Sequence, residues 1–203
     1  MSKILIVAIV MCTCLGIASE GVGWDGQRKG FIVGFGAGPG LTSSTMEDER
    51  NALGPSARDN TWGLQTDFVI GYAPTSRLQV YYSNKVSWFK ISVVDVTAIS
   101  GLTGVGASYF LNSQVPSPFL SGGLGVAVWD DPFDEWFDRS LGFGLWGGVG
   151  YEFARHCSAE LDLVWGNPTH DYPTIGEGGA LTGTQEWRIS SISIMLMVKV
   201  LGY

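Results

Sequence analysis

The chain has 203 residues, with 19 acidic and 12 basic side chains and a formal net charge of −7. This acidic balance argues against nucleic-acid binding, because that function needs clustered lysine and arginine to neutralise phosphates. Charged residues make up only 15% of the chain, and no apolar run after residue 18 reaches the roughly 20 residues of a membrane helix. A single domain of this composition is either a soluble β protein with a large core or a membrane β-barrel.

The first 18 residues have the pattern of a secretory signal peptide. Lys3 supplies a positive charge, residues 4–17 are almost entirely apolar, and Gly16 and Ala18 are the small residues of a cleavage site. We therefore expect export, with cleavage after Ala18 or one residue later. Residues 19–29 are polar and contain glycine, and we expect them to form a short periplasmic segment.

Cysteine usage agrees with this expectation. Lipidation at Cys12 or Cys14 is an alternative to simple cleavage. Cleavage removes both residues and leaves only Cys157, so no internal disulfide is expected. Stability must then come from packing and from backbone hydrogen bonds.

From residue 30 onwards, stretches of alternating apolar and polar residues predict eight strands. The expected strands are 30–41, 62–73, 77–89, 99–111, 119–129, 140–153, 158–166 and 187–203. Short turns follow the second, fourth and sixth strands, and longer loops follow the others, at 42–61, 90–98, 130–139 and 167–186. This alternation is typical of outer-membrane barrels, whose short turns are periplasmic. The predicted fold is all-β: residues 30–203 form a closed, up-and-down, antiparallel transmembrane β-barrel of about eight strands.

The alternation also separates ionisable side chains from large apolar ones. In 158–166, Glu160 and Asp162 alternate with Leu161 and Leu163. A lysine on the lipid face near the midplane would cost about 2–4 kcal/mol, so the charged face is expected to line the lumen. Glycines share this face and leave room for bulky neighbours such as Trp146. The expected lumen network is Asp67, Glu152, Glu160, Asp162 and Lys199, with Lys85 and Arg77 as further ion-pair partners.

The chief alternative fold is a secreted soluble barrel of lipocalin type, which also has eight strands but turns its apolar face inward. In a barrel of about eight strands the interior is filled by side chains, so no open aqueous channel is expected.

Residues 147–153, Gly-Gly-Val-Gly-Tyr-Glu-Phe, are followed by Arg155-His156 and by Ser-Ala-Glu-Leu-Asp at 158–162. This segment resembles the small outer-membrane barrels of the OmpA/OmpX-like and opacity-protein-like group, and the aromatic last residue, Tyr203, is similar too. The resemblance implies a monomer in the Gram-negative outer membrane, in contact with its lipid and lipopolysaccharide. It also implies insertion by the barrel-assembly machinery, which reads the terminal aromatic and the alternation before it. Here the clean apolar alternation lies on the opposite parity, because counting back by twos from Tyr203 meets Lys199.

Two segments could carry chemistry. His156 and Ser158, with a nearby carboxylate, invite a hydrolase interpretation, because some barrels of this size are lipid A deacylases that use serine, histidine and an acid. These residues fall in a predicted periplasmic turn, away from the outer leaflet that holds lipid A. We therefore expect a turn histidine rather than a catalytic one.

The second segment is an acidic loop, predicted to be extracellular. Its carboxylates could hold a divalent cation through oxygen ligands or form an adhesive patch, although no calcium-loop spacing is present. We favour a solvated loop. The candidate loop residues are Asp130, Asp131, Asp134, Glu135 and Asp138.

The sequence therefore predicts a surface barrel without catalysis or cofactor, which serves envelope structure or surface interaction through its extracellular loops. The alternatives are a lipid A-modifying enzyme, a small porin, and a soluble lipocalin-like binding barrel. Function in this architecture resides in loops and sites, whereas the barrel is a generic scaffold.

Overall fold

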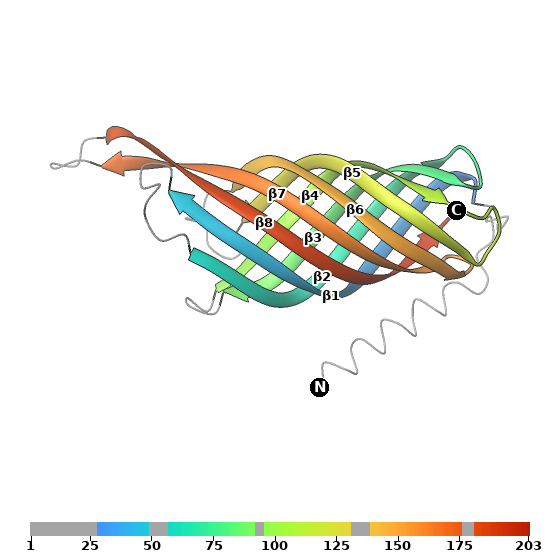
Figure 1. Ribbon diagram of the computed structural model, residues 1–203. Coiled ribbons are helices and arrows are strands. Elements are labelled where there is room, and N and C mark those ends of the chain that lie inside the picture. Colours follow the sequence, from blue (N-terminus) through green and yellow to red (C-terminus); the bar gives the residue numbers. More distant parts are fainter. Residues whose placement is uncertain (1–27, 49–56, 92–95, 131–138, 176–180) are drawn as a thin grey trace.

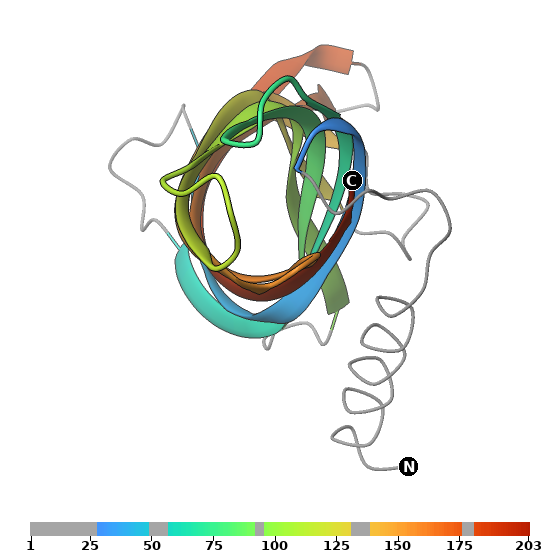
Figure 2. The ribbon, with the colours of Figure 1, turned by 90° about the vertical axis from the view of Figure 1, so that its right-hand side faces the viewer.

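A computed structural model describes residues 28–48, 57–91, 96–130, 139–175 and 181–203. They form eight strands: β1 (Gly30–Asp48), β2 (Ala57–Ala73), β3 (Leu78–Ile91), β4 (Val96–Phe110), β5 (Ser117–Asp130), β6 (Ser140–Ala154), β7 (Cys157–Ile175) and β8 (Leu181–Gly202). Each strand pairs antiparallel with the next, and β8 pairs with β1, so the sheet closes in up-and-down order (Figures 1 and 2). The predicted fold class is confirmed. No stretch of the described residues forms a helix with the length and hydropathy of a membrane span.

Three of the connections lie at one end of the barrel, where the chain also ends (Figure 1). They join β2 to β3, β4 to β5, and β6 to β7. We call this the short-turn end and the opposite one the long-loop end. The expected signal peptide, 1–18, and most of the segment 19–29 lie outside the described residues.

The strands continue further toward the long-loop end than the sequence predicts. Most of the expected loops 42–61 and 167–186 are strand, because pairing persists to Met46 with Ala57 and to Ile175 with Leu181. A hairpin that extends past the apolar band needs no apolar face, so its residues lose the period-two pattern that identifies a strand.

The β7–β8 hairpin projects from the barrel. Pairing of β7 with β6 ends at Thr169, and pairing of β8 with β1 ends at Trp187. Residues 170–175 and 181–186 therefore pair only with each other and form a two-stranded ribbon, visible in orange and red at the left of Figure 1. This ribbon presents backbone edges that no other strand of the barrel covers.

Large apolar side chains cover the outside of the barrel. On β7, Leu161 and Leu163 are 47% and 53% exposed, whereas Glu160 and Asp162 are 2% and 1% exposed. The same alternation runs along β8, where the residues from Ile192 to Val198 with even numbers are exposed and their odd-numbered neighbours are buried. A soluble barrel of lipocalin type has the opposite arrangement, so this observation excludes that alternative.

Inward-facing glycines make room for the largest lumen side chains. A Cβ added to Gly36 would lie 2.5 Å from Cγ of Lys199, and one added to Gly106 would lie 2.5 Å from Cζ2 of Trp146. A Cβ on Gly148 would overlap the carboxylate of Asp162. These positions therefore need glycine for space.

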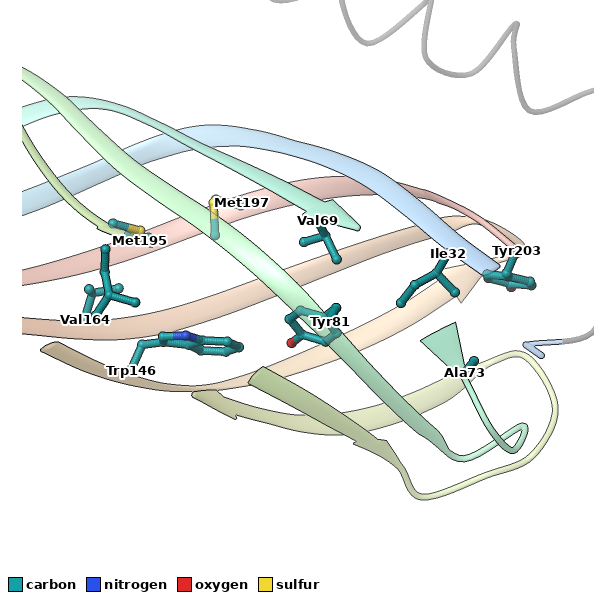
Figure 3. Packing of buried hydrophobic residues seen from close by; sticks show 10 residues of the cluster. Ile32, Val69, Ala73, Tyr81, Trp146, Val164, Met195, Met197 and Tyr203 are labelled. Atoms are coloured by element: carbon teal, nitrogen blue, oxygen red, sulfur yellow. The ribbon is translucent and has the colours of Figure 1, made fainter. Parts of the chain in front are cut away.

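Apolar side chains fill the lumen on both sides of its polar groups, toward the short-turn end and toward the long-loop end. One cluster contains Ile32, Val69, Ala73, Tyr81, Leu102, Trp146, Val164, Met195, Met197 and Tyr203 (Figure 3). A second cluster lies nearer the long-loop end, where the rings of Phe89 and Trp129 are 5.4 Å apart. The barrel thus has a packed core in its interior, as expected for eight strands.

Candidate functional site

The centre of the lumen contains an ion pair between strands that are not neighbours. Nζ of Lys85 on β3 lies 2.9 Å from Oδ2 of Asp67 on β2 and 2.5 Å from Oδ2 of Asp162 on β7. The side chains of all three are inaccessible to solvent. Because β3 and β7 are separated by three strands in either direction, this contact spans the barrel.

Lys199 on β8 joins the same network. Its Nζ lies 2.5 Å from Oδ2 of Asp67 and also pairs with Glu160. Asp67 therefore bridges the two ammonium groups. Buried ion pairs are tolerated only where further hydrogen bonds satisfy the remaining oxygens. Two hydroxyls do this: Ser83 donates to Asp67 at 2.7 Å, and Ser121 donates to Glu160 at 2.5 Å.

The three carboxylates lie close enough together to consider a metal ion. Their oxygens are within 4.8 Å of one another. However, the ammonium groups of Lys85 and Lys199 already contact all three carboxylates. Lys85 also lies over the ring of Trp146, at 4.3 Å from its centre, which is a favourable cation–π contact. The residues present therefore suit an internal salt-bridge network and not a metal site.

A layer of hydroxyl and amide groups lies next to this network, toward the long-loop end. Ser87 donates to Oε1 of Gln65 at 2.5 Å and to Ser193 at 3.2 Å, and Thr42 and Ser193 share a hydrogen bond of 2.8 Å. All of these side chains are buried. Ion pairs in the central network and hydrogen bonds in this neighbouring layer thus connect different strands across the lumen.

A second polar cluster closes the short-turn end. Nε of Arg28, which precedes β1, lies 2.8 Å from Oε2 of Glu152. Nη1 of Arg28 donates to the carbonyls of Ser76 at 2.9 Å and Asn112 at 3.0 Å. Arg28 is 2% exposed. It therefore ties the end of β6 to the β2–β3 and β4–β5 turns, across the mouth of the barrel. We call this contact set the Arg28 plug.

Aromatic rings complete the Arg28 plug. The guanidinium of Arg28 lies over the ring of Phe110, at 4.2 Å from its centre. The hydroxyl of Tyr203 donates to Oε1 of Glu152 at 2.7 Å, and its ring packs against His156 with centres 4.5 Å apart. The last residue of the chain thus faces inward, and this explains why the apolar alternation of β8 lies on the opposite parity.

The structure places the predicted lumen residues in two groups. Asp67, Glu160, Asp162 and Lys199 meet in the central network together with Lys85. Glu152 lies apart from them, in the Arg28 plug. The prediction for Arg77 was wrong, because Arg77 is exposed in the β2–β3 turn. Arg28 takes that role and was missed, since a single basic residue before the first strand belongs to no alternating pattern.

Of the five acidic loop residues, only Asp130 lies within the described part of the chain. It ends β5 and its Oδ2 pairs with Nε of Arg139 at 2.9 Å. Asp131, Asp134, Glu135 and Asp138 lie outside the described residues. At least one of the five carboxylates is therefore engaged by an arginine.

His156 and Ser158 do not form a nucleophile–base pair. His156 occupies the β6–β7 turn with a left-handed φ of 67°, and its Nδ1 shares a hydrogen bond of 2.8 Å with the carbonyl of Leu201. Oγ of Ser158 is buried and has no hydrogen-bond partner among the described residues. The cavity beside them has a volume of about 10 Å³, which suits a water molecule and no acyl chain. This geometry does not support lipid A deacylation.

No family model and no curated protein matches the chain. Solved structures do. The outer membrane protein OprG from Pseudomonas aeruginosa is 14% identical, with a TM-score of 0.50 over 88% of this chain and 99% of that one. Neisserial surface protein A is 18% identical, with a TM-score of 0.45 over 84% and 96%. The outer membrane protein AlkL is 13% identical, with a TM-score of 0.48 over 90% and 93%.

At this level of identity the likeness concerns the fold. The match to OprG extends over nearly all of both chains, and its strands close in the same kind of barrel. Together with the apolar exterior and the ion-paired lumen, it identifies the architecture that the sequence resemblance implied. The chain has the fold of the small eight-stranded outer-membrane β-barrels.

Proposed function

We propose that the chain is a Gram-negative outer-membrane barrel that acts as a structural or surface-interaction protein through its long-loop end. The observation that carries this proposal is the inside-out distribution of polarity, with leucines and aromatics outside and ion pairs within. In contact with lipid, every backbone polar group must be paired, and a closed sheet leaves no edge. The proposal includes contact with membrane lipid and lipopolysaccharide, and insertion by the barrel-assembly machinery.

Side chains fill the lumen along its length, and this argues against a pore. The Arg28 plug covers the short-turn end, the central ion pairs span the barrel, and Phe89 and Trp129 pack nearer the long-loop end. An ion entering from either side would have to displace buried charges that already have partners. We therefore place the function on the outer surface and not in the lumen.

The long-loop end offers the surface for interaction. The β7–β8 ribbon extends beyond the barrel wall at this end (Figure 1). Loops held by a rigid scaffold are where binding residues concentrate in barrel proteins. We propose that the short-turn end, which contains Arg28 and Tyr203, faces the periplasm.

Cysteine labelling of intact cells tests both membrane insertion and orientation. Arg139→Cys and Arg77→Cys are a matched pair, because both arginines are exposed and lie at opposite ends of the barrel. Cys157 is buried and serves as the unlabelled background. We expect a membrane-impermeant maleimide to label Arg139→Cys in intact cells and Arg77→Cys only after the outer membrane is permeabilised.

Fractionation completes the test. Wild-type protein should sediment with the outer membrane and migrate differently on gels before and after boiling, as closed barrels do. Recovery in the soluble periplasm would refute the membrane assignment. Labelling of Arg77→Cys but not Arg139→Cys in intact cells would refute the orientation.

A further inference from the structure

Asn84 places a polar side chain on the outer face of the barrel. It lies at the middle of β3, and it is exposed while Ser83 and Lys85 on either side are buried in the lumen. Along the outer face of β3, Tyr82 precedes it and Val86 follows it. Across the strand pairings it lies opposite Phe68 on β2 and Thr103 on β4, and the wider outer surface is largely apolar: Phe68 and Val105 are 42% and 60% exposed.

The height of Asn84 corresponds to the centre of the apolar band. It is six positions along the strand from Leu78 and seven from Ile91 at the other end of β3. At about 3.3 Å per residue and a tilt of about 40°, the two ends lie roughly 15 Å and roughly 18 Å away along the barrel axis. The apolar band of such barrels is about 25 Å tall, so this amide lies near its midplane.

Neighbouring polar groups on the same face already have partners. The hydroxyls of Tyr82 and Thr103 share a hydrogen bond, and Nε1 of Trp88 donates to Thr66 at 3.1 Å. The amide of Asn84 has no hydrogen-bond partner in the part of the chain that the structure describes. Acyl chains cannot supply one, and an unpaired amide in hydrocarbon is unfavourable.

We propose that Asn84 is the contact point of a parallel homodimer in the membrane. An amide carries both a donor and an acceptor, so two copies of Asn84 can form a pair of hydrogen bonds across a two-fold axis along the membrane normal. A second copy inserted in the same direction presents its amide at the same depth, which no lipid does. This inference rests on the proposed membrane location, and it differs from the monomer expected from the sequence.

The convex barrel wall limits the contact to a narrow zone around β3. The dimer is therefore weak and populated at high protein-to-lipid ratio. Hydrogen bonds between membrane segments contribute modestly, so removal of the amide should weaken association by about tenfold.

Förster transfer between labelled copies in lipid vesicles, measured over a range of protein-to-lipid ratios, tests this proposal. Asn84→Leu removes the amide, and Asn84→Gln retains it. Asn167→Leu is the matched control, because Asn167 follows Trp165 on β7 beyond the apolar stretch and is partly exposed. We expect transfer in the wild type, in Asn84→Gln and in Asn167→Leu, with about tenfold weaker association in Asn84→Leu.

A disulfide test gives the position of the contact. Asn84→Cys in a Cys157→Ala background should form a cross-linked dimer in membranes under mild oxidation. Leu163→Cys, which is exposed on the opposite wall of the barrel, should form far less. The proposal would be overturned if Asn84→Leu associated as strongly as the wild type. It would also be overturned if energy transfer in the wild type were no greater than that expected for copies distributed at random in the membrane. Variants that insert and shift on gels but stay monomeric contradict only the dimer, whereas failure of wild type to insert contradicts the proposed function.

Discussion

Lys85 on β3 and Asp162 on β7 meet across the barrel, with Nζ and Oδ2 2.5 Å apart and neither side chain accessible to solvent. The strands that carry them do not pair. The contact therefore depends on closure of the whole sheet, and it fixes opposite walls of the barrel relative to each other. The fold and the lumen network are consequently parts of one arrangement.

Removal of the Lys85 ammonium should destabilise the barrel strongly. Lys85→Met leaves the carboxylates of Asp67 and Asp162 buried with less compensation, and loss of one partner of a buried pair costs about 3–5 kcal/mol. Lys90→Met, at the exposed end of the same strand, should change stability by less than about 1 kcal/mol. Urea unfolding from lipid vesicles measures both. Equal stability of the two variants would show that the network is not a stabilising element.

Adjacent glycines on β6 should respond in opposite ways to the same substitution. In Gly148→Val the new side chain overlaps the Asp162 carboxylate, so we expect a loss of about 1–3 kcal/mol from overpacking. In Gly147→Val the side chain points outward, where a Cβ meets no atom nearer than 3.9 Å. That variant should be neutral or slightly stabilised, because valine favours strands. Comparison of their unfolding midpoints tests which face of β6 is the lumen.

The sequence predicts the faces of the strands better than the contacts within the lumen. Period-two alternation suffices to place Glu160 and Asp162 on the inner face of β7. The alternation does not predict that Asp162 contacts Lys85. Which residues face each other across a closed barrel depends on the stagger of all eight strands. The long strand ends were missed for another reason: residues 170–175 and 181–186 pair beyond the barrel wall, where no apolar face is needed.

The short-turn end was the least predictable part. Arg28 is a single basic residue before the first strand, and its partners Glu152, Ser76 and Asn112 come from three distant segments. Arg77 was expected to pair with lumen acids, but the β3 strand begins one residue after it and leaves it in the turn. Only the closed structure brings the correct arginine to the mouth of the barrel.

Loss of Arg28 should loosen the short-turn end. Arg28→Ala removes the ion pair with Glu152 and two hydrogen bonds to turn carbonyls, and we expect a loss of about 3 kcal/mol. Amide hydrogen exchange should rise in the β2–β3 and β4–β5 turns. Lys29→Ala is the control, since Lys29 is exposed next to Arg28, and it should stay within about 0.5 kcal/mol of wild type. Unchanged exchange in Arg28→Ala would contradict a closing role for this residue.

Conductance should be absent even when the Arg28 plug is removed. In planar bilayers we expect no stable channel from the wild type or from Arg28→Ala, because the Lys85–Asp162 ion pair still crosses the lumen and Lys199 remains paired with Asp67 and Glu160. The double variant Arg28→Ala, Lys85→Ala removes both the Arg28 plug and the ion pairs of Lys85. It is the variant in which we expect ions to pass. Reproducible current steps from wild-type protein would instead support a small pore.

The central claim, that β8 turns its even-numbered residues to lipid and its odd-numbered residues to a sealed lumen, is tested most directly by spin labelling. Single cysteines from Ser193 to Val198, in a Cys157→Ala background, can carry a nitroxide whose collisions with oxygen report contact with acyl chains. We predict high collision rates at 194, 196 and 198 and low rates at 193, 195 and 197. High rates at the odd positions, or rates without a period of two, would contradict the account.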